Sequence, residues 1–131
     1  MDDGKRDAWC LTRLLCWNQT QEARMTQVGL LIKLVTQAGQ RDALVAHLQA
    51  AAQAIVDEPG TLLWTIHTTP TDDHTVWLYE VYADEGAQHA HETAPGYAAG
   101  MQQTQALLAA PPEVVRLTPV GGKSPTAPAA R

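Results

Sequence analysis

Glu80 is the residue whose position in this sequence most readily suggests chemistry. It lies in the middle of an apolar alternation, between Leu78 and Tyr82, and shares their face of a predicted strand. Burying an ionised carboxylate there costs free energy unless the group is paired or hydrogen-bonded. Glu80 is therefore either an acid of a functional site or a structural anchor for a helix N-terminus or for His91, and both interpretations stay open.

Histidines supply the other groups that could exchange protons near neutral pH. His67 ends a predicted strand, where it could reach the mouth of a pocket or only solvent. His89 and His91 lie two residues apart on a predicted helix, roughly 200° around its axis, so they cannot bind one metal ion together. His47 and His74, like His89, are expected at the surface. The histidine pattern predicts no metal site.

Large aromatic side chains alternate along the same part of the chain: Trp64, Trp77, Tyr79 and Tyr82. They could form the walls of a pocket, or they could be core and interface, which is the commoner use of aromatic residues. The two alternations point to opposite faces, so only one can line a given pocket. Tyr97, at the start of a later helix, could cap that pocket or attach its helix to the core.

Composition bounds the class of protein. The chain carries a formal charge of -5 with scattered basic residues, which argues against a nucleic-acid partner. Cys10 and Cys16 match neither a metal-binding spacing nor a disulfide framework. The N-terminal stretch has no uninterrupted apolar segment of the kind found in signal peptides or membrane spans. We expect a cytoplasmic protein with no membrane partner.

Hydrophobic periodicity predicts the elements that must position these residues. Glu58-Pro59-Gly60 is typical of a turn, and Asp84 is a plausible helix N-cap. A polar segment, Thr68 to Thr75, is expected to separate the two strands of a hairpin and to belong to neither. The expected order is a strand at 28–35, a helix at 41–56, the hairpin from about 62 to 82, helices at 85–93 and 97–108, and a strand at 113–120.

This order predicts an α+β fold, a ferredoxin-like split βαβ arrangement with an antiparallel sheet. The hairpin strands carry large apolar groups on both faces, and one layer of helices can cover only one face. We therefore expect a second copy of the chain to cover the other. The predicted boundaries are a loosely ordered N-terminal extension at residues 1–26, one domain at 27–120 and a flexible tail at 121–131.

Several of these features together resemble the antibiotic biosynthesis monooxygenase (ABM) family. They are Glu58-Pro59-Gly60, a strand ending in His67, a polar hairpin, the run Leu78-Tyr79-Glu80-Val81-Tyr82-Ala83-Asp84-Glu85, and His91 followed by Pro95-Gly96-Tyr97. The resemblance covers about residues 28–123. It implies a dimeric α+β barrel that oxidises phenols, quinols or polyketide-like aromatic compounds with dioxygen and without a cofactor.

The resemblance also implies roles for particular residues. His91 matches the family's histidine near the end of the second helix, where a neutral imidazole could take a phenolic proton or orient the substrate oxygen. A structural alternative is a hydrogen bond from His91 to a backbone carbonyl, which would hold the loop before Pro95. We expect His91 and Glu80 as the catalytic pair, and a substrate would be contacted by Trp64, His67, Tyr79, Tyr82 and Tyr97.

Proteins that this sequence resembles also have other functions, so alternatives to the monooxygenase remain. Haem degradation is disfavoured because the segment Tyr97-Ala98-Ala99-Gly100-Met101 holds no histidine at the place where that branch ligates iron. An isomerase of a phosphorylated substrate needs a cationic pocket, and the predicted core elements offer only Lys33, Arg41 and Arg116. A non-catalytic barrel that binds a small hydrophobic ligand is the alternative from another class; it predicts an open groove or no cavity.

Overall fold

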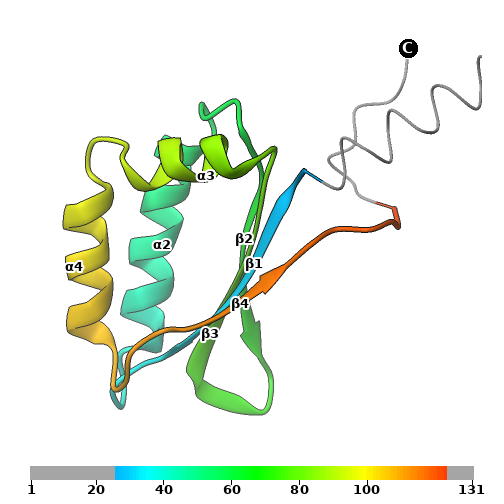
Figure 1. The fold of residues 1–131 in the computed structure, drawn as a ribbon. Helices are drawn as coiled ribbons and strands as arrows, with labels where there is room; N and C mark the ends of the chain where they lie inside the picture. The colour runs from blue at the N-terminus through cyan, green and yellow to red at the C-terminus, as the bar shows by residue number, and fades with distance from the viewer. Residues whose placement is uncertain (1–25, 124–131) are drawn as a thin grey trace, which may run out of the picture.

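The computed structural model describes residues 26–123, which form one antiparallel sheet with helices on one of its faces (Figure 1). The sheet is four-stranded, with strand order β2-β3-β1-β4. The α+β, ferredoxin-like prediction is confirmed. The elements are β1 Val28–Val35, α2 Arg41–Ile55, β2 Thr61–Thr69, β3 Asp72–Tyr82, α3 Glu85–Glu92, α4 Tyr97–Leu107 and β4 Glu113–Leu117. The predicted extension and tail lie almost wholly outside the described residues.

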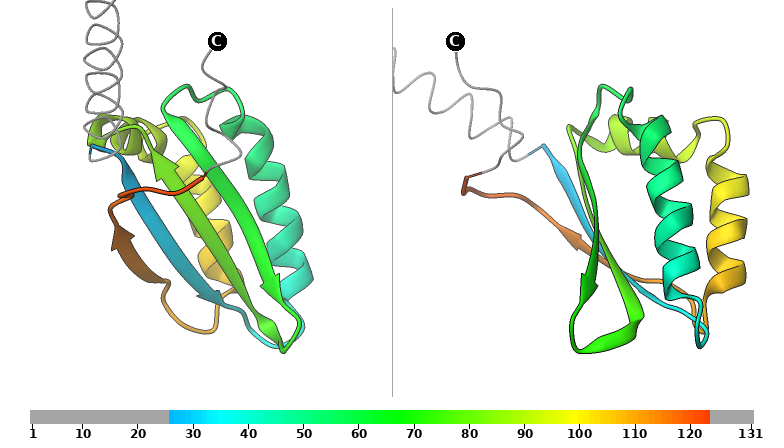
Figure 2. Two further views of the ribbon diagram at one scale, coloured as in Figure 1. Left: turned by 90° about the vertical axis from the view of Figure 1, so that its right-hand side faces the viewer. Right: turned by 180° about the vertical axis from the view of Figure 1, so that it is seen from behind.

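Strand β1 is central and has the bounds that the sequence predicts. It pairs with β3 from Val28↔Tyr82 to Val35↔Thr75, and with β4 on its other side. Because a central strand is flanked by strands on both edges, an apolar sequence broken only by Gly29 and Lys33 suits it. Figure 2 shows that α2, α3 and α4 all pack against the same face of this sheet.

The core lies between that face and α2. Leu44 and Leu48 of α2 are 0% and 4% exposed and pack against Leu34, Val76 and Leu78 of the sheet. A buried leucine of this kind stabilises the fold by about 2 kcal/mol through removal of its surface from water. Within residues 26–123 no helix is both long enough and apolar enough to cross a membrane.

The hairpin is tighter than the sequence suggests, and the prediction that Thr68 to Thr75 belongs to no strand is wrong. Strand β2 runs to Thr69 and β3 begins at Asp72, so only two residues connect them. Threonine is β-branched and favours strands. The Asp72 carboxylate also accepts hydrogen bonds from the backbone N–H of His74, at 2.6 Å, and from the Thr75 hydroxyl.

The last strand is shorter than predicted. It ends at Leu117, whereas the sequence pattern suggests an end at Val120. Pro119 has no N–H to donate to a neighbouring strand, and it restricts the backbone of Thr118 before it. The three helix predictions are confirmed to within one residue at each end, and Asp84 caps α3 by accepting a hydrogen bond from the Ala87 N–H at 2.7 Å.

Close packing in the turn before β2 leads to a first prediction. A Cβ added at Gly60 would lie 2.5 Å from the Ala87 Cβ of α3, so one of the two segments must move. We expect Gly60→Ala to lower the free energy of unfolding by about 1–3 kcal/mol, measured by chemical denaturation. Gly100→Ala is the matched control, because nothing lies within 4 Å of its added Cβ and helix α4 should gain up to about 1 kcal/mol. Equal stabilities of the two variants would contradict the packing argument.

Candidate active site

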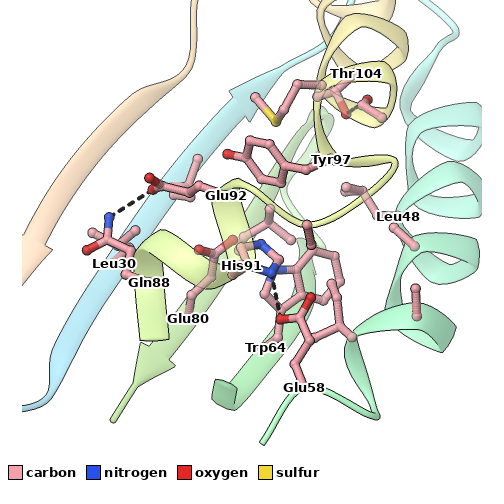
Figure 3. Close-up of a pocket in the computed structure, with 18 of the residues that line it drawn as sticks. Leu30, Leu48, Glu58, Trp64, Glu80, Gln88, His91, Glu92, Tyr97 and Thr104 are labelled. Atoms are coloured by element: carbon pink, nitrogen blue, oxygen red, sulfur yellow. Dashed lines mark hydrogen bonds and ion pairs between the residues drawn. The ribbon is translucent and has the colours of Figure 1, made fainter. Parts of the chain in front are cut away.

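A cavity of about 550 Å³ lies between the helix-covered face of the sheet and the helices (Figure 3). Its surface is mostly apolar, and these walls come from Leu30, Ile32, Leu34, Leu48, Leu78 and Met101. Polar side chains gather where α3 crosses the ends of β2 and β3. A mostly apolar cavity with a few polar groups at one end is the usual form of a small-molecule site.

The structure shows which alternation of the hairpin faces this cavity. Trp64, Glu80 and Tyr82 line it, and Tyr97 does so from α4. His67 and Tyr79 do not line it. Both belong to the other alternation, where His67 is exposed and shares a 2.8 Å hydrogen bond with the Thr65 hydroxyl. The cavity therefore brings together five of the residues expected at a site, and leaves His67 and Tyr79 on the opposite face.

His91 lies at the polar end of the cavity. Helix α3 presents it, and the side chain is buried between two phenol rings. The ring centroids of Tyr82 and Tyr97 lie 5.4 and 5.3 Å from that of His91. Such contacts restrict the orientation of the imidazole from both sides.

The partner of His91 is a carboxylate and not the backbone carbonyl of the structural alternative. His91 Nδ1 lies 2.8 Å from Glu58 Oε2, as the dashed line in Figure 3 shows. The other ring nitrogen, Nε2, has no hydrogen bond within residues 26–123, and it is not among the side-chain atoms sealed from solvent without a partner. Nε2 is therefore the atom of His91 that a bound molecule can reach.

Among the described residues, the Glu80 side chain is hydrogen-bonded to the Tyr82 hydroxyl and to neither His91 nor a helix N-terminus. That hydroxyl donates to Glu80 Oε2 at 2.7 Å. Burial raises the pKa of Glu80, and it outweighs the hydrogen bond from Tyr82 and the charge that His91 carries when it is protonated, which both favour the carboxylate. Burial likewise raises the pKa of Tyr82 and of Tyr97. The buried Trp64 side chain also favours the ionised form of Glu80, although its Nε1 makes no hydrogen bond of ordinary geometry within the described residues.

Sequence reasoning missed several polar residues of the cavity, among them Glu58, His47 and Glu92. Glu58 was assigned only to a turn, although an acid beside a Pro-Gly turn that precedes a strand was the available signal. His47 was expected at the surface; this is wrong, because its Nε2 lies 3.0 Å from the Gly100 carbonyl oxygen and the residue lines the cavity. Glu92, at the end of α3, accepts a 2.9 Å hydrogen bond from Gln88. No sequence signal distinguished Glu92 from other surface acids.

The outer part of the cavity is formed by β4. Val114 and Arg116 line it there, and Val114 is 57% exposed. Arg116 donates a 2.7 Å hydrogen bond to Glu85, so its charge is paired with an acid of α3. Between residues 26 and 123 no group of three histidine, cysteine or acidic side chains is arranged to hold a metal ion.

Comparison with known proteins finds a family model and solved structures that match this chain. The family model for antibiotic biosynthesis monooxygenase matches residues 28–103. A structure of a protein ascribed to that family from Chloroflexus aurantiacus J-10-fl is 31% identical, with a TM-score of 0.66, and the match covers 75% of this chain and 97% of that one. A protein of unknown function from Nitrosomonas europaea is 28% identical, with a TM-score of 0.68 and coverage of 78% and 97%.

A more distant structure shares the fold alone. SnoaB from Streptomyces nogalater, described as a cofactor-independent oxygenase, is 16% identical, with a TM-score of 0.66 and coverage of 74% and 96% of the two chains. A search of curated protein sequences found no significant match. The match of the family model over more than half of the sequence, together with the Chloroflexus structure, shows that this chain belongs to the antibiotic biosynthesis monooxygenase family.

Proposed function

We propose that the protein is a monooxygenase that oxidises a phenolic, quinol or polyketide-like aromatic substrate with dioxygen and without a cofactor. The observation that carries the proposal is the cavity, in which apolar walls lead to His91 Nε2 and the Glu80 carboxyl. The aromatic rings of such a substrate would pack against the apolar walls, and its acidic hydroxyl or methylene would lie at the polar end. Family membership and the description of SnoaB as a cofactor-independent oxygenase support the same class of reaction.

The proposed chemistry begins with proton transfer to His91. Neutral imidazole takes a proton from the phenol or from the activated methylene, and the substrate anion gives electrons to dioxygen to form a C–O bond. The resulting peroxide takes up a proton. Loss of the second C–H proton then breaks the O–O bond, forms the carbonyl and releases water, so that R₂CH₂ and O₂ give R₂C=O and H₂O.

Glu80 is the proposed proton donor to the peroxide. Its pKa is raised by burial, so the carboxyl keeps a proton at higher pH than an exposed glutamic acid does. The Tyr82 hydroxyl donates to Glu80 Oε2, and in the proposed step the proton leaves from the other carboxyl oxygen. Within one apolar site, the imidazole can then accept a proton from the substrate and the carboxyl can donate a proton to the peroxide.

The test is incorporation of oxygen from the gas. The purified full chain, dialysed against chelator, is incubated with anthrone-like phenols and quinols under ¹⁸O₂, and products are analysed by mass spectrometry. We expect one ¹⁸O atom in the quinone or ketone product, at a rate well above the autoxidation blank. Binding of these compounds without any turnover would contradict the proposed enzymatic function and favour the alternative of a non-catalytic ligand-binding protein.

We further propose that the enzyme is a homodimer that uses the sheet face left free of helices. Within residues 26–123 no helix covers this face (Figure 2), and the strand register places Leu31, Trp77 and Tyr79 on it. On the edge strand β4, Val115 and Leu117 are 51% and 40% exposed. Large apolar side chains gathered on one open face are typical of an interface.

The dimer is tested by placing a charge on that face. We expect the wild-type chain to sediment as a dimer, and Val115→Lys to raise the dimer dissociation constant by at least about tenfold, equivalent to ~1.4 kcal/mol. Val56→Lys is the matched control, because Val56 is 78% exposed just after α2, away from this face. Equal sedimentation of the two variants would contradict the proposed interface.

A further inference from the structure

Glu58 is held in place by contacts that do not involve the cavity. Its backbone N–H donates to the Ile55 carbonyl at 2.9 Å, and its own carbonyl accepts from the Thr61 N–H at 3.3 Å. The Thr61 hydroxyl also donates to Glu58 Oε2 at 2.7 Å. Backbone and side chain of Glu58 are therefore both fixed by the turn between α2 and β2.

The same carboxyl oxygen determines which nitrogen of His91 carries the proton. An ionised carboxylate can only accept hydrogen bonds, so the 2.8 Å contact requires a proton on Nδ1. In a neutral imidazole the other nitrogen is then an acceptor with a free lone pair. That nitrogen is Nε2, the one without a hydrogen-bond partner in the described part of the chain.

The contacts that orient the His91 imidazole differ from the contact that determines which of its nitrogens carries the proton. Tyr82 and Tyr97 pack against the imidazole and fix where its atoms lie, but neither ring hydrogen-bonds to Nδ1. Without Glu58 the ring could stay in place while its proton moved to Nε2. His91 would then present a donor to the cavity and could not accept a substrate proton.

We propose that Glu58 is a positioning residue, whose carboxylate, anchored by Thr61, keeps the proton of neutral His91 on Nδ1 and presents Nε2 to the substrate as a base. The catalytic consequence rests on the proposed oxygenation. The tautomer itself does not, because it is a property of the free protein. An experiment can therefore contradict the proposed tautomer without contradicting the proposed oxygenation, and the reverse.

The first measurement is the tautomer of His91 in the ¹⁵N-histidine-labelled full chain, by two-bond ¹H–¹⁵N correlation spectra at a pH where the ring is neutral. The signals are assigned with His91→Gln. We expect the Nδ1–H form in the wild type, and loss of its predominance in Glu58→Ala. Glu58→Met keeps the length but lacks an acceptor, and it gives the same readout if the alanine variant does not fold. Glu58→Gln retains an acceptor oxygen and should restore part of the Nδ1–H population.

Asp73→Asn is the matched control, because Asp73 forms a comparable contact with another histidine, His74, at 3.1 Å on the exposed hairpin. It should leave the His91 signals unchanged. Retention of the Nδ1–H form in both Glu58→Ala and Glu58→Met would overturn the proposal, whether or not a substrate is found. With an accepted substrate, kcat of Glu58→Ala should fall about 10–100-fold at nearly constant KM. A rise in KM at constant kcat would also overturn it.

Discussion

Replacing His91 by glutamine is expected to lower the rate of oxygen uptake with an accepted phenolic substrate by about 10²–10⁴-fold. Glutamine fills much of the space between the rings of Tyr82 and Tyr97, so α3 should stay in place, but an amide cannot take up a proton near neutral pH. The loss should appear in kcat, since the apolar walls that bind the rings of the substrate are unchanged. The measurement is oxygen uptake by the chelator-treated protein, corrected for autoxidation.

Two further variants make this result specific. His74→Ala removes a histidine that is exposed on the hairpin, and it should leave the rate unchanged. His91→Ala removes both the base and the packing, so it should lose activity and some stability as well. If glutamine kept the full rate and only alanine lost it, His91 would be a packing residue and another group would have to act as the base.

The elements could be predicted because their signals are local. An apolar run bounded at 28 and 35 became β1 with those limits, and Asp84 caps α3 because the capping contact lies within one turn. The hairpin was predicted too loosely, since threonines count as polar in a pattern yet favour strands. The face that each strand presents to the helices was left open, because alternation gives two faces without saying which one packs.

The site could be predicted only in part, because its contacts are long-range. The sequence offered His91, Glu80 and the aromatic residues as candidates by residue type. It could not pair His91 with Glu58, which lies 33 residues away and meets it only when α3 folds over the turn before β2. His47 was misplaced for a similar reason, as its partner Gly100 belongs to α4 and no periodicity in α2 shows it.

Glu80→Gln should stabilise the protein at neutral pH. Burial favours the protonated form of Glu80, so the folded state holds this proton more tightly than the unfolded state does. The contribution of Glu80 to stability is therefore greatest in acid and is lost as the pH rises through its raised pKa. Glutamine is neutral throughout and can still accept from the Tyr82 hydroxyl. Denaturation curves should show the variant more stable than the wild type at pH 7, and the difference should vanish well below the ordinary value of 4.5.

The same substitution is expected to lower kcat by about 10²–10⁴-fold if Glu80 protonates the peroxide, because an amide cannot donate a proton and recover it. A residue that lowers stability at neutral pH and raises the rate is retained for its chemistry, whereas replacing a structural anchor should lower the stability. Oxygen uptake and denaturation on one preparation distinguish the two roles. A variant that is less stable at pH 7 yet fully active would assign Glu80 to the architecture of the fold, and the proton donor would have to be the imidazolium of His91.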